Sequence, residues 1–234
     1  MPTYLVVFLV LLIVAVFAIT LVSAWLGDNR RTQLMAWARA NGMTYQQESR
    51  DLARRWSDSP FIGGPSARAL DVISGTTSTR RQFYSYTYQY IVPTGKSAVV
   101  IRAWVTVVRL PRELPWLTVT PETIGGKLSK TFGGQDINVE SVDFNRDFRV
   151  QSELPEFAIA FLHPQLIEWL LGSGRGLVPF RVIGQHMLCW QADTQLDTSQ
   201  LMAVVDGLDA LASQIPAFIW DDYGHIPGNA DPLG

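Results

Sequence analysis

The segment QFYSYTYQYIVPTGKSAVVIRAWVTVVRL, residues 82–110, carries the pattern that decides the fold. Residues 98–109 have a period of two, which is typical of a β-strand whose alternate side chains share one face. Residues 81–92 alternate in the same way, and Pro93-Thr94-Gly95 supplies a turn between the two runs. We therefore expect two strands, the second of them in the core. The residues expected on the inner face of this core strand are Val99, Ile101, Ala103, Val105 and Val107.

Other strand signals lie on both sides of this segment. Residues 68–75 alternate and lead into 81–92 through Gly75 and a polar turn. Pro111 and Pro115 follow the core strand, and we expect them to end it.

Further along the chain, alternation returns at 137–141 and at 148–150, with a turn expected at Asn145. Residues 180–191 predict a hairpin around Gly184-Gln185, because glycine in the first position favours a two-residue turn.

Three segments of the domain have helical character. Residues 121–131 open at Pro121-Glu122, and residues 155–171 contain Pro164, which predicts a break at His163. A third helix is expected at 198–214, where Pro216 stops it. Strands and helices mixed along one chain predict the α+β class.

The first 27 residues predict a single transmembrane helix. No charged side chain precedes Asp28, and the run from Tyr4 to Leu26 is almost entirely apolar. A helix needs roughly 20 such residues to cross a bilayer. Tyr4 and Trp25 suit the two membrane interfaces, where amphipathic aromatic residues are enriched. The alternative is a cleaved signal peptide, but the run has no basic start and exceeds the roughly 7–15 apolar residues of such a peptide.

The basic residues after the apolar run predict its orientation. Arg30, Arg31 and Arg39 follow the helix, and only the α-amino group precedes it. The positive-inside rule then places the C-terminal domain in the cytoplasm of a single-pass cell-membrane protein. The helix expected at 28–42 can lie against anionic lipid headgroups or be an ordinary solvated linker.

The predicted layout has four parts along the chain. They are an anchor at 1–27, juxtamembrane helices and linker at 28–60, an α+β cytoplasmic domain at 61–216 and an acidic C-terminal tail at 217–234.

Composition argues against several classes of function. A net charge of −2 argues against nucleic acid as a partner, which would favour a basic face. The single cysteine, Cys189, rules out an intrachain disulfide and lies in an apolar run typical of a buried thiol. Neither glycine-rich stretch, at 125–127 or 172–176, has the spacing of a phosphate-binding loop. No histidine cluster predicts a metal, and no acid, base or nucleophile constellation is visible. We therefore expect no catalytic site and no cofactor.

Four tyrosines form the most distinctive candidate surface. Tyr84, Tyr86, Tyr88 and Tyr90 have period-two spacing, so their rings share one face of a strand. Rings with polar tips suit a partner surface or a lipid-lined groove. The alternative is that a helix packs over them and they belong to the core.

Across most of its length the sequence resembles a known family. The matching stretches include 34–38, 114–115 and 119–122, the dense run from Asp136 to Pro164, and Ile215-Pro216-Ala217-Phe218 with Trp220. In these residues the chain resembles the membrane-anchored trehalose monomycolate transport factor family of actinobacteria. The resemblance implies a cytoplasmic domain with an antiparallel β-sheet and flanking helices. It also implies a non-enzymatic factor that associates with an RND-type lipid transporter and supports export of a cell-envelope glycolipid.

The expected function is thus a membrane-tethered adaptor whose partners are the lipid bilayer and an integral-membrane protein. The alternatives are an accessory subunit of another membrane assembly, such as a respiratory complex, and a lipid- or small-molecule-binding module on the tyrosine surface. An enzyme is the class of function that the sequence favours least.

Overall fold

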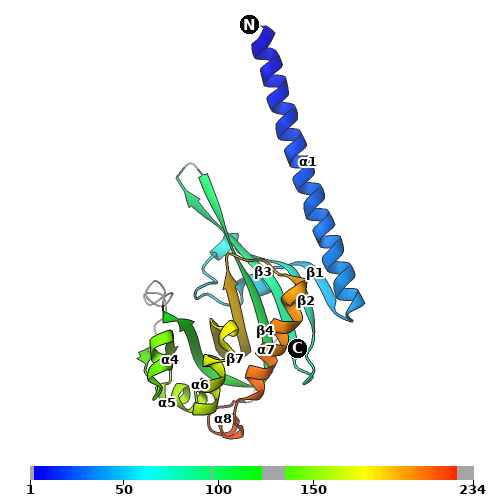
Figure 1. The fold of residues 1–234 in the computed structure, drawn as a ribbon. Helices are drawn as coiled ribbons and strands as arrows, with labels where there is room; N and C mark the ends of the chain where they lie inside the picture. Colours follow the sequence, from blue (N-terminus) through cyan, green and yellow to red (C-terminus); the bar gives the residue numbers. More distant parts are fainter. Residues whose placement is uncertain (1–2, 96, 123–134, 226–234) are drawn as a thin grey trace.

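In the computed structural model, one long helix leads into a sheet with helices on both faces (Figure 1). The structure describes residues 3–95, 97–122 and 135–225, and within the long helix it describes side chains at positions 8, 11–17 and 29 onward. The strands are β1 (Thr44–Ser49), β2 (Arg68–Thr76), β3 (Gln82–Thr94), β4 (Ser97–Pro121), β5 (Gln135–Ile137), β6 (Phe148–Ser152) and β7 (Phe180–Ala192). The α-helices are α1 (Thr3–Ala40), α2 (Arg50–Arg54), α4 (Val142–Asp147), α5 (Pro155–Phe161), α6 (Pro164–Leu171), α7 (Thr198–Ser213) and α8 (Ala217–Asp222), and the short 3-10 helices are η1 (Gly64–Ser66) and η2 (Arg175–Leu177).

The sheet is organised around β4. Every pairing between the described strands is antiparallel, in the order β1-β2-β3-β4-β6-β5, and β7 pairs with β4 beside this path. β3 and β7 pair with the same residues 103–108 of β4, so they occupy its opposite edges. The predicted antiparallel sheet and α+β class are confirmed.

β4 does not end at its prolines, as the sequence led us to expect. β3 pairs up to Val108 and β6 begins to pair at Leu117, so none of the described strands pairs with that edge of β4 at residues 109–116. Glu113, in this stretch, forms an isolated bridge with His225. The register with β7 also shifts on either side of Leu114. Pro111 and Pro115 lie in this irregular stretch, where a missing N–H breaks no ladder hydrogen bond. The strand therefore bends through both prolines and continues.

The hairpin predicted at 180–191 is also wrong, because β7 is one unbroken strand. Residues 186–192 and residues 180–184 both pair with β4 in the same antiparallel direction, with a register shift on either side of Gly184. Gly184 has a φ of +54° and lies opposite Leu114, at the irregularity of β4. Glycine tolerates this left-handed conformation, which here serves a bulge rather than a turn.

The region from 137 to 152 differs from the predicted alternation. β5 ends at Ile137, and Ser141 instead caps α4, its hydroxyl accepting a hydrogen bond from the Phe144 amide (3.3 Å). Asn145 lies inside α4, where its side chain bonds both backbone groups of Val139 (3.0 and 2.7 Å). The strand expected at 148–150 is confirmed as β6. Most of the helix expected at 121–131 lies outside the described residues.

Local helix signals were reliable elsewhere. The break at His163 separates α5 from α6, and the His163 side chain caps α6. α7 matches the helix expected at 198–214 and presents Leu201, Val205 and Leu208 to the core. α8 lies in the segment predicted as an acidic tail, and its Ile219 is fully buried.

The N-terminal segment forms one continuous helix rather than separate anchor and juxtamembrane helices. α1 runs from Thr3 to Ala40, and β1 follows within the stretch predicted as juxtamembrane helices and linker. β1 pairs with β2, so this stretch contributes a strand to the sheet. Among the helical residues with described side chains, no stretch combines the length and the hydropathy that a bilayer crossing requires. The anchor at 1–27 stays a prediction.

Two buried clusters lie on opposite faces of the sheet. One face, here called the helix face, carries α5, α6, α7 and the end of α1; its core includes Leu34, Phe83, Trp104, Phe161 and Leu201. The other, here called the tyrosine face, is covered by α2 and the 56–66 segment; its core includes Leu52, Trp56, Phe61, Tyr86, Tyr88 and Trp190.

Candidate functional site

A groove with a largely polar lining lies between α1 and the start of α7, on the helix face. One wall comes from α1, where Arg30, Gln33, Leu34 and Trp37 follow each other at helical spacing and so share one side of the helix. Leu34 is buried against the sheet, and Trp37 is half-buried beside it. This packing places the end of α1 firmly on the domain.

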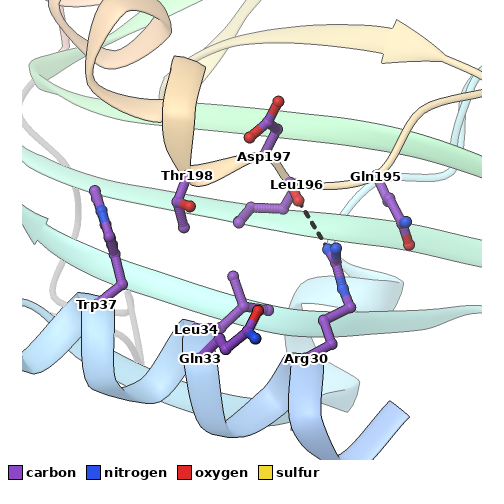
Figure 2. A pocket seen from close by; sticks show the side chains of 8 residues that line it. All are labelled: Arg30, Gln33, Leu34, Trp37, Gln195, Leu196, Asp197 and Thr198. Atoms are coloured by element: carbon purple, nitrogen blue, oxygen red, sulfur yellow. Dashed lines mark hydrogen bonds between the residues drawn. The ribbon is translucent and has the colours of Figure 1, made fainter. Parts of the chain in front are cut away.

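The opposite wall is the segment 195–198 that leads into α7 (Figure 2). Leu196 is buried, and its amide donates a hydrogen bond to the Thr87 hydroxyl of β3 (3.0 Å). Asp197 is the N-cap of α7 and accepts bonds from the Ser199 amide (2.9 Å) and hydroxyl (2.8 Å). These bonds, the backbone bond first, lower the pKa of Asp197. The wall therefore carries a fixed carboxylate.

Arg30 joins the two walls. Its Nη2 donates to the Leu196 carbonyl (2.8 Å), as the dashed line in Figure 2 shows, and its Nε lies 3.5 Å from Asp71 Oδ2 on β2. Asp71 also accepts a bond from the Tyr45 hydroxyl (2.8 Å). Burial first, and then this bond, raise the pKa of Tyr45, so the phenol stays protonated and keeps donating. Arg30 thus bonds the domain itself, a role that its sequence context did not predict.

The cavity enclosed by these walls measures about 450 Å³. Its lining offers the amides of Gln33 and Gln195, the Thr198 hydroxyl, one cation, one carboxylate and the indole of Trp37. Several hydrogen-bonding groups around one aromatic ring suit a hydroxyl-rich headgroup, whose C–H faces can lie on the ring while its hydroxyls bond the amides. In the part of the chain that the structure describes, no three His, Cys, Asp or Glu side chains are grouped to hold a metal.

The predicted tyrosine surface is largely internal. Tyr84, Tyr86, Tyr88 and Tyr90 do share the tyrosine face, but Tyr86 and Tyr88 are only 0% and 1% exposed. The ring of Phe61 packs 5.1 Å from that of Tyr88 at a steep angle, and the Gly63 amide donates to the Tyr88 hydroxyl (3.0 Å). The central pair therefore offers no open partner surface, because α2 and the 56–66 segment cover it. Tyr84 and Tyr90 remain half-buried at the ends of the stripe.

A second groove, of about 500 Å³, lies on the outside of this cover. It is lined by Ala53, Arg54, Trp56, Ser57, Phe61, Ile62, Gly64 and Pro65. Its lining residues include none of the four tyrosines.

The cysteine and two of the histidines considered in the sequence, Cys189, His163 and His186, have contacts that belong to the fold. Cys189 is buried, and burial raises the pKa of its thiol to about 12, which leaves no thiolate at neutral pH. His163 caps α6, accepting from the Leu166 amide (3.4 Å). His186 packs against Trp56 on the tyrosine face, opposite to Cys189 on the helix face.

Arg181 is the buried residue that sequence reasoning missed. It is 0% exposed, donates to the Thr118 hydroxyl (2.9 Å) and the Ser59 carbonyl (2.8 Å), and lies over the Trp190 ring. Burial lowers its pKa to about 10, against the opposing charge of Asp58. These contacts attach the 56–66 segment to β4 and β7. An arginine in an alternating strand gives no sign of such burial, because the carbonyl that it bonds is 122 residues away.

Comparison with protein-family models and with curated protein sequences finds no match. A solved structure does match: the crystal structure of the mycobacterial trehalose monomycolate transport factor A, TtfA. The similarity has a TM-score of 0.60 at 12% sequence identity, and it covers 85% of this chain and 98% of that chain. This chain therefore has a TtfA-like fold.

Proposed function

We propose that the protein is a membrane-anchored, non-enzymatic accessory protein of an inner-membrane complex that exports a cell-envelope glycolipid. The observation that carries the proposal is the fold likeness to TtfA, which extends over 98% of that chain. TtfA is named as a trehalose monomycolate transport factor.

The proposed anchor comes from the sequence of α1. The run from Tyr4 to Leu26 is uncharged and long enough for a bilayer, and Arg30, Arg31 and Arg39 follow it. With this orientation the domain is cytoplasmic. The groove between α1 and α7, which begins at Arg30, then lies at the level of the lipid headgroups.

The proposed partner is a polytopic transporter of the RND type, which the family resemblance implies. Anchoring confines the domain to the plane of the membrane and so raises its effective concentration near such a partner. An adaptor of this kind needs a surface that binds its partner and a location at the membrane, and it needs no catalytic chemistry of its own.

Affinity purification of the tagged full chain in mild detergent tests this function. We expect a large polytopic membrane protein to co-purify, and mass spectrometry to identify it as a transporter. The same tag on another single-pass protein of the host is the control. Isolation of the protein as a free monomer in several detergents would contradict the proposal. Co-purification of a respiratory complex would instead favour an accessory subunit of that complex.

The polar lining of the groove favours a second candidate function, the binding of a glycolipid headgroup by the protein itself. Native mass spectrometry of the full chain released from its own membranes should then detect a bound glycolipid. The variant Gln195→Leu should lose this mass, because it removes an amide from the wall, whereas Arg39→Ala, on an exposed part of α1, should keep it. Equal occupancy in both variants, or none in the wild type, would exclude this function.

A further inference from the structure

The β3–β4 hairpin extends beyond the sheet as a two-stranded arm, defined here as residues 90–94 and 97–101. The last residue of β3 that pairs with β2 is Gln89, and the first residue of β4 that pairs with β7 is Ala103. Among the described strands, the arm residues pair only with each other, from Tyr90–Ile101 to Thr94–Ser97. The Ser66 hydroxyl bonds the amide (3.2 Å) and the carbonyl (3.3 Å) of Ile91 at the base of the arm. Beyond Ile91 the described arm is a two-stranded ribbon, which is marginally stable in water, so something else is expected to cover it.

The arm exposes apolar side chains on both of its faces. Ile91 (46% exposed) lies across from Val100 (41%), and Val92 (38%) lies across from Val99 (46%). Because alternate residues point to opposite faces, the first pair faces one way and the second pair the other. A protein that docked on one face, or added a strand to one edge, would leave the other apolar pair in water.

The charge of the arm favours a lipid surface. From Tyr90 to Ile101 the sequence contains no Asp or Glu, and its only charged residue is Lys96. A basic residue in an apolar segment without acidic residues is attracted to the anionic headgroups of the cytoplasmic leaflet.

The arm points in the same direction as the N-terminal half of α1 (Figure 1). Arg30 bonds Leu196, whose amide bonds Thr87, so Arg30 and Thr87 lie at about the same level. From Thr87 to the end of the arm at Thr94 the strand covers roughly 23 Å, at about 3.3 Å per residue. From Arg30 the apolar run of α1 begins only about 6 Å further along the helix. The tip therefore passes the level of Asp28 even when the arm is inclined by about 60° to the helix, which halves its reach.

We propose that the arm inserts its tip into the same bilayer that α1 is proposed to cross, as a second membrane contact of the domain. This inference rests on the anchor of the proposed function. With two points of attachment the domain cannot rotate freely about α1, and its groove keeps one orientation toward the headgroups.

Depth-dependent fluorescence quenching of the full chain tests the arm directly. In a Cys189→Ala background, single cysteines replace Val99 in the arm, Phe17 in α1 and Ser78 in the β2–β3 turn, and each carries an NBD label. The protein is reconstituted into vesicles of phosphatidylcholine and phosphatidylglycerol with doxyl-labelled lipid. We expect the lipid to quench the label at 99 and at 17, with emission shifted to shorter wavelength, and to leave the label at 78 unquenched.

The outcomes separate the arm from the anchor. Quenching at 17 without quenching at 99 overturns the insertion of the arm and keeps the anchor. If position 99 were then protected only in the purified complex, the arm would instead contact a protein partner. Quenching at 99 without quenching at 17 keeps the arm and overturns the anchor. No quenching at either position overturns both.

A second variant tests the apolar contact itself. Thr replaces Ile91, Val92, Val99 and Val100 together, which keeps β-branched side chains in both strands while adding hydroxyls. These four side chains are outside both cores, so circular dichroism should be unchanged. A label at Thr94→Cys should lose its quenching in this variant. Quenching equal to that of the parent chain would overturn an apolar insertion.

Discussion

Tyr86 and Tyr88 are neighbours on one face of β3, and they differ in the hydrogen bonding of their hydroxyls. The Tyr88 hydroxyl accepts a bond from the Gly63 amide, whereas the Tyr86 hydroxyl is buried and finds no hydrogen-bond partner among the described residues. Burial raises the pKa of both phenols. One ring therefore carries a desolvated hydroxyl without compensation.

This difference predicts opposite effects of the same substitution. Tyr86→Phe removes the uncompensated hydroxyl and should raise the free energy of unfolding by about 1 kcal/mol. Tyr88→Phe leaves the Gly63 amide without its acceptor and should lower it by about the same amount. Urea denaturation of both variants in mild detergent measures the two changes. Equal losses of stability in both would refute the assignment of the hydroxyls.

Arg30 and Arg31 are adjacent, and among the described residues the domain accepts a hydrogen bond and an ion pair from Arg30, whereas Arg31 is exposed. Arg30→Ala removes the bond to the Leu196 carbonyl and the ion pair with Asp71, at a half-buried site. We expect it to lower stability by about 1 kcal/mol and to speed hydrogen exchange at residues 195–198. Arg31→Ala, at an exposed site, is the matched control and should change neither. Equal hydrogen exchange at residues 195–198 in both variants would contradict the role of Arg30 in holding this segment to α1.

At the scale of elements, one ion pair connects the β2–β3 turn to α7. Asp209 accepts bonds from Arg81 Nη1 (2.6 Å) and from the Thr79 hydroxyl (2.7 Å), and its side chain is only 4% exposed. Burial works to raise the pKa of Asp209, but the bonds from Thr79 and Arg81 and the charge of Arg81 outweigh it, so the pKa is lowered.

Asp209→Asn should therefore destabilise the protein in a pH-dependent way. At neutral pH we expect a loss of about 2 kcal/mol, below that of a fully buried pair because Arg81 is 22% exposed. A carboxyl with a lowered folded-state pKa stabilises the fold above its unfolded value and loses this contribution as pH falls. The difference between wild type and variant should thus shrink below about pH 4. Denaturation curves at pH 7 and pH 3 measure it, and a difference independent of pH would contradict the pair.

At the scale of the whole molecule, the charges after the apolar run predict on which side of the membrane the domain lies. External protease added to intact spheroplasts should leave a C-terminal tag uncut, and disruption of the membrane should allow its cleavage. A periplasmic protein with the same tag serves as the accessible control. Cleavage of the tag in intact spheroplasts would place the domain outside.

The sequence by itself determined the elements whose signals are local. Period-two runs located β2, β3, β6 and the first half of β4, and Pro164 and Pro216 located helix ends, because alternation and a missing N–H act within a few residues. The shared face of the four tyrosines was predictable for the same reason.

Only the tertiary structure decided how far the strands run and what covers them. β4 continues through Pro111 and Pro115 because its partners change there from β3 to β6, and β7 passes Gly184 because it follows that bend. Tyr86 and Tyr88 are buried by the 56–66 segment, and Arg30 meets a carbonyl 166 residues away. Such pairings depend on contacts between distant parts of the chain, and the pattern of residues within a short segment does not predict them.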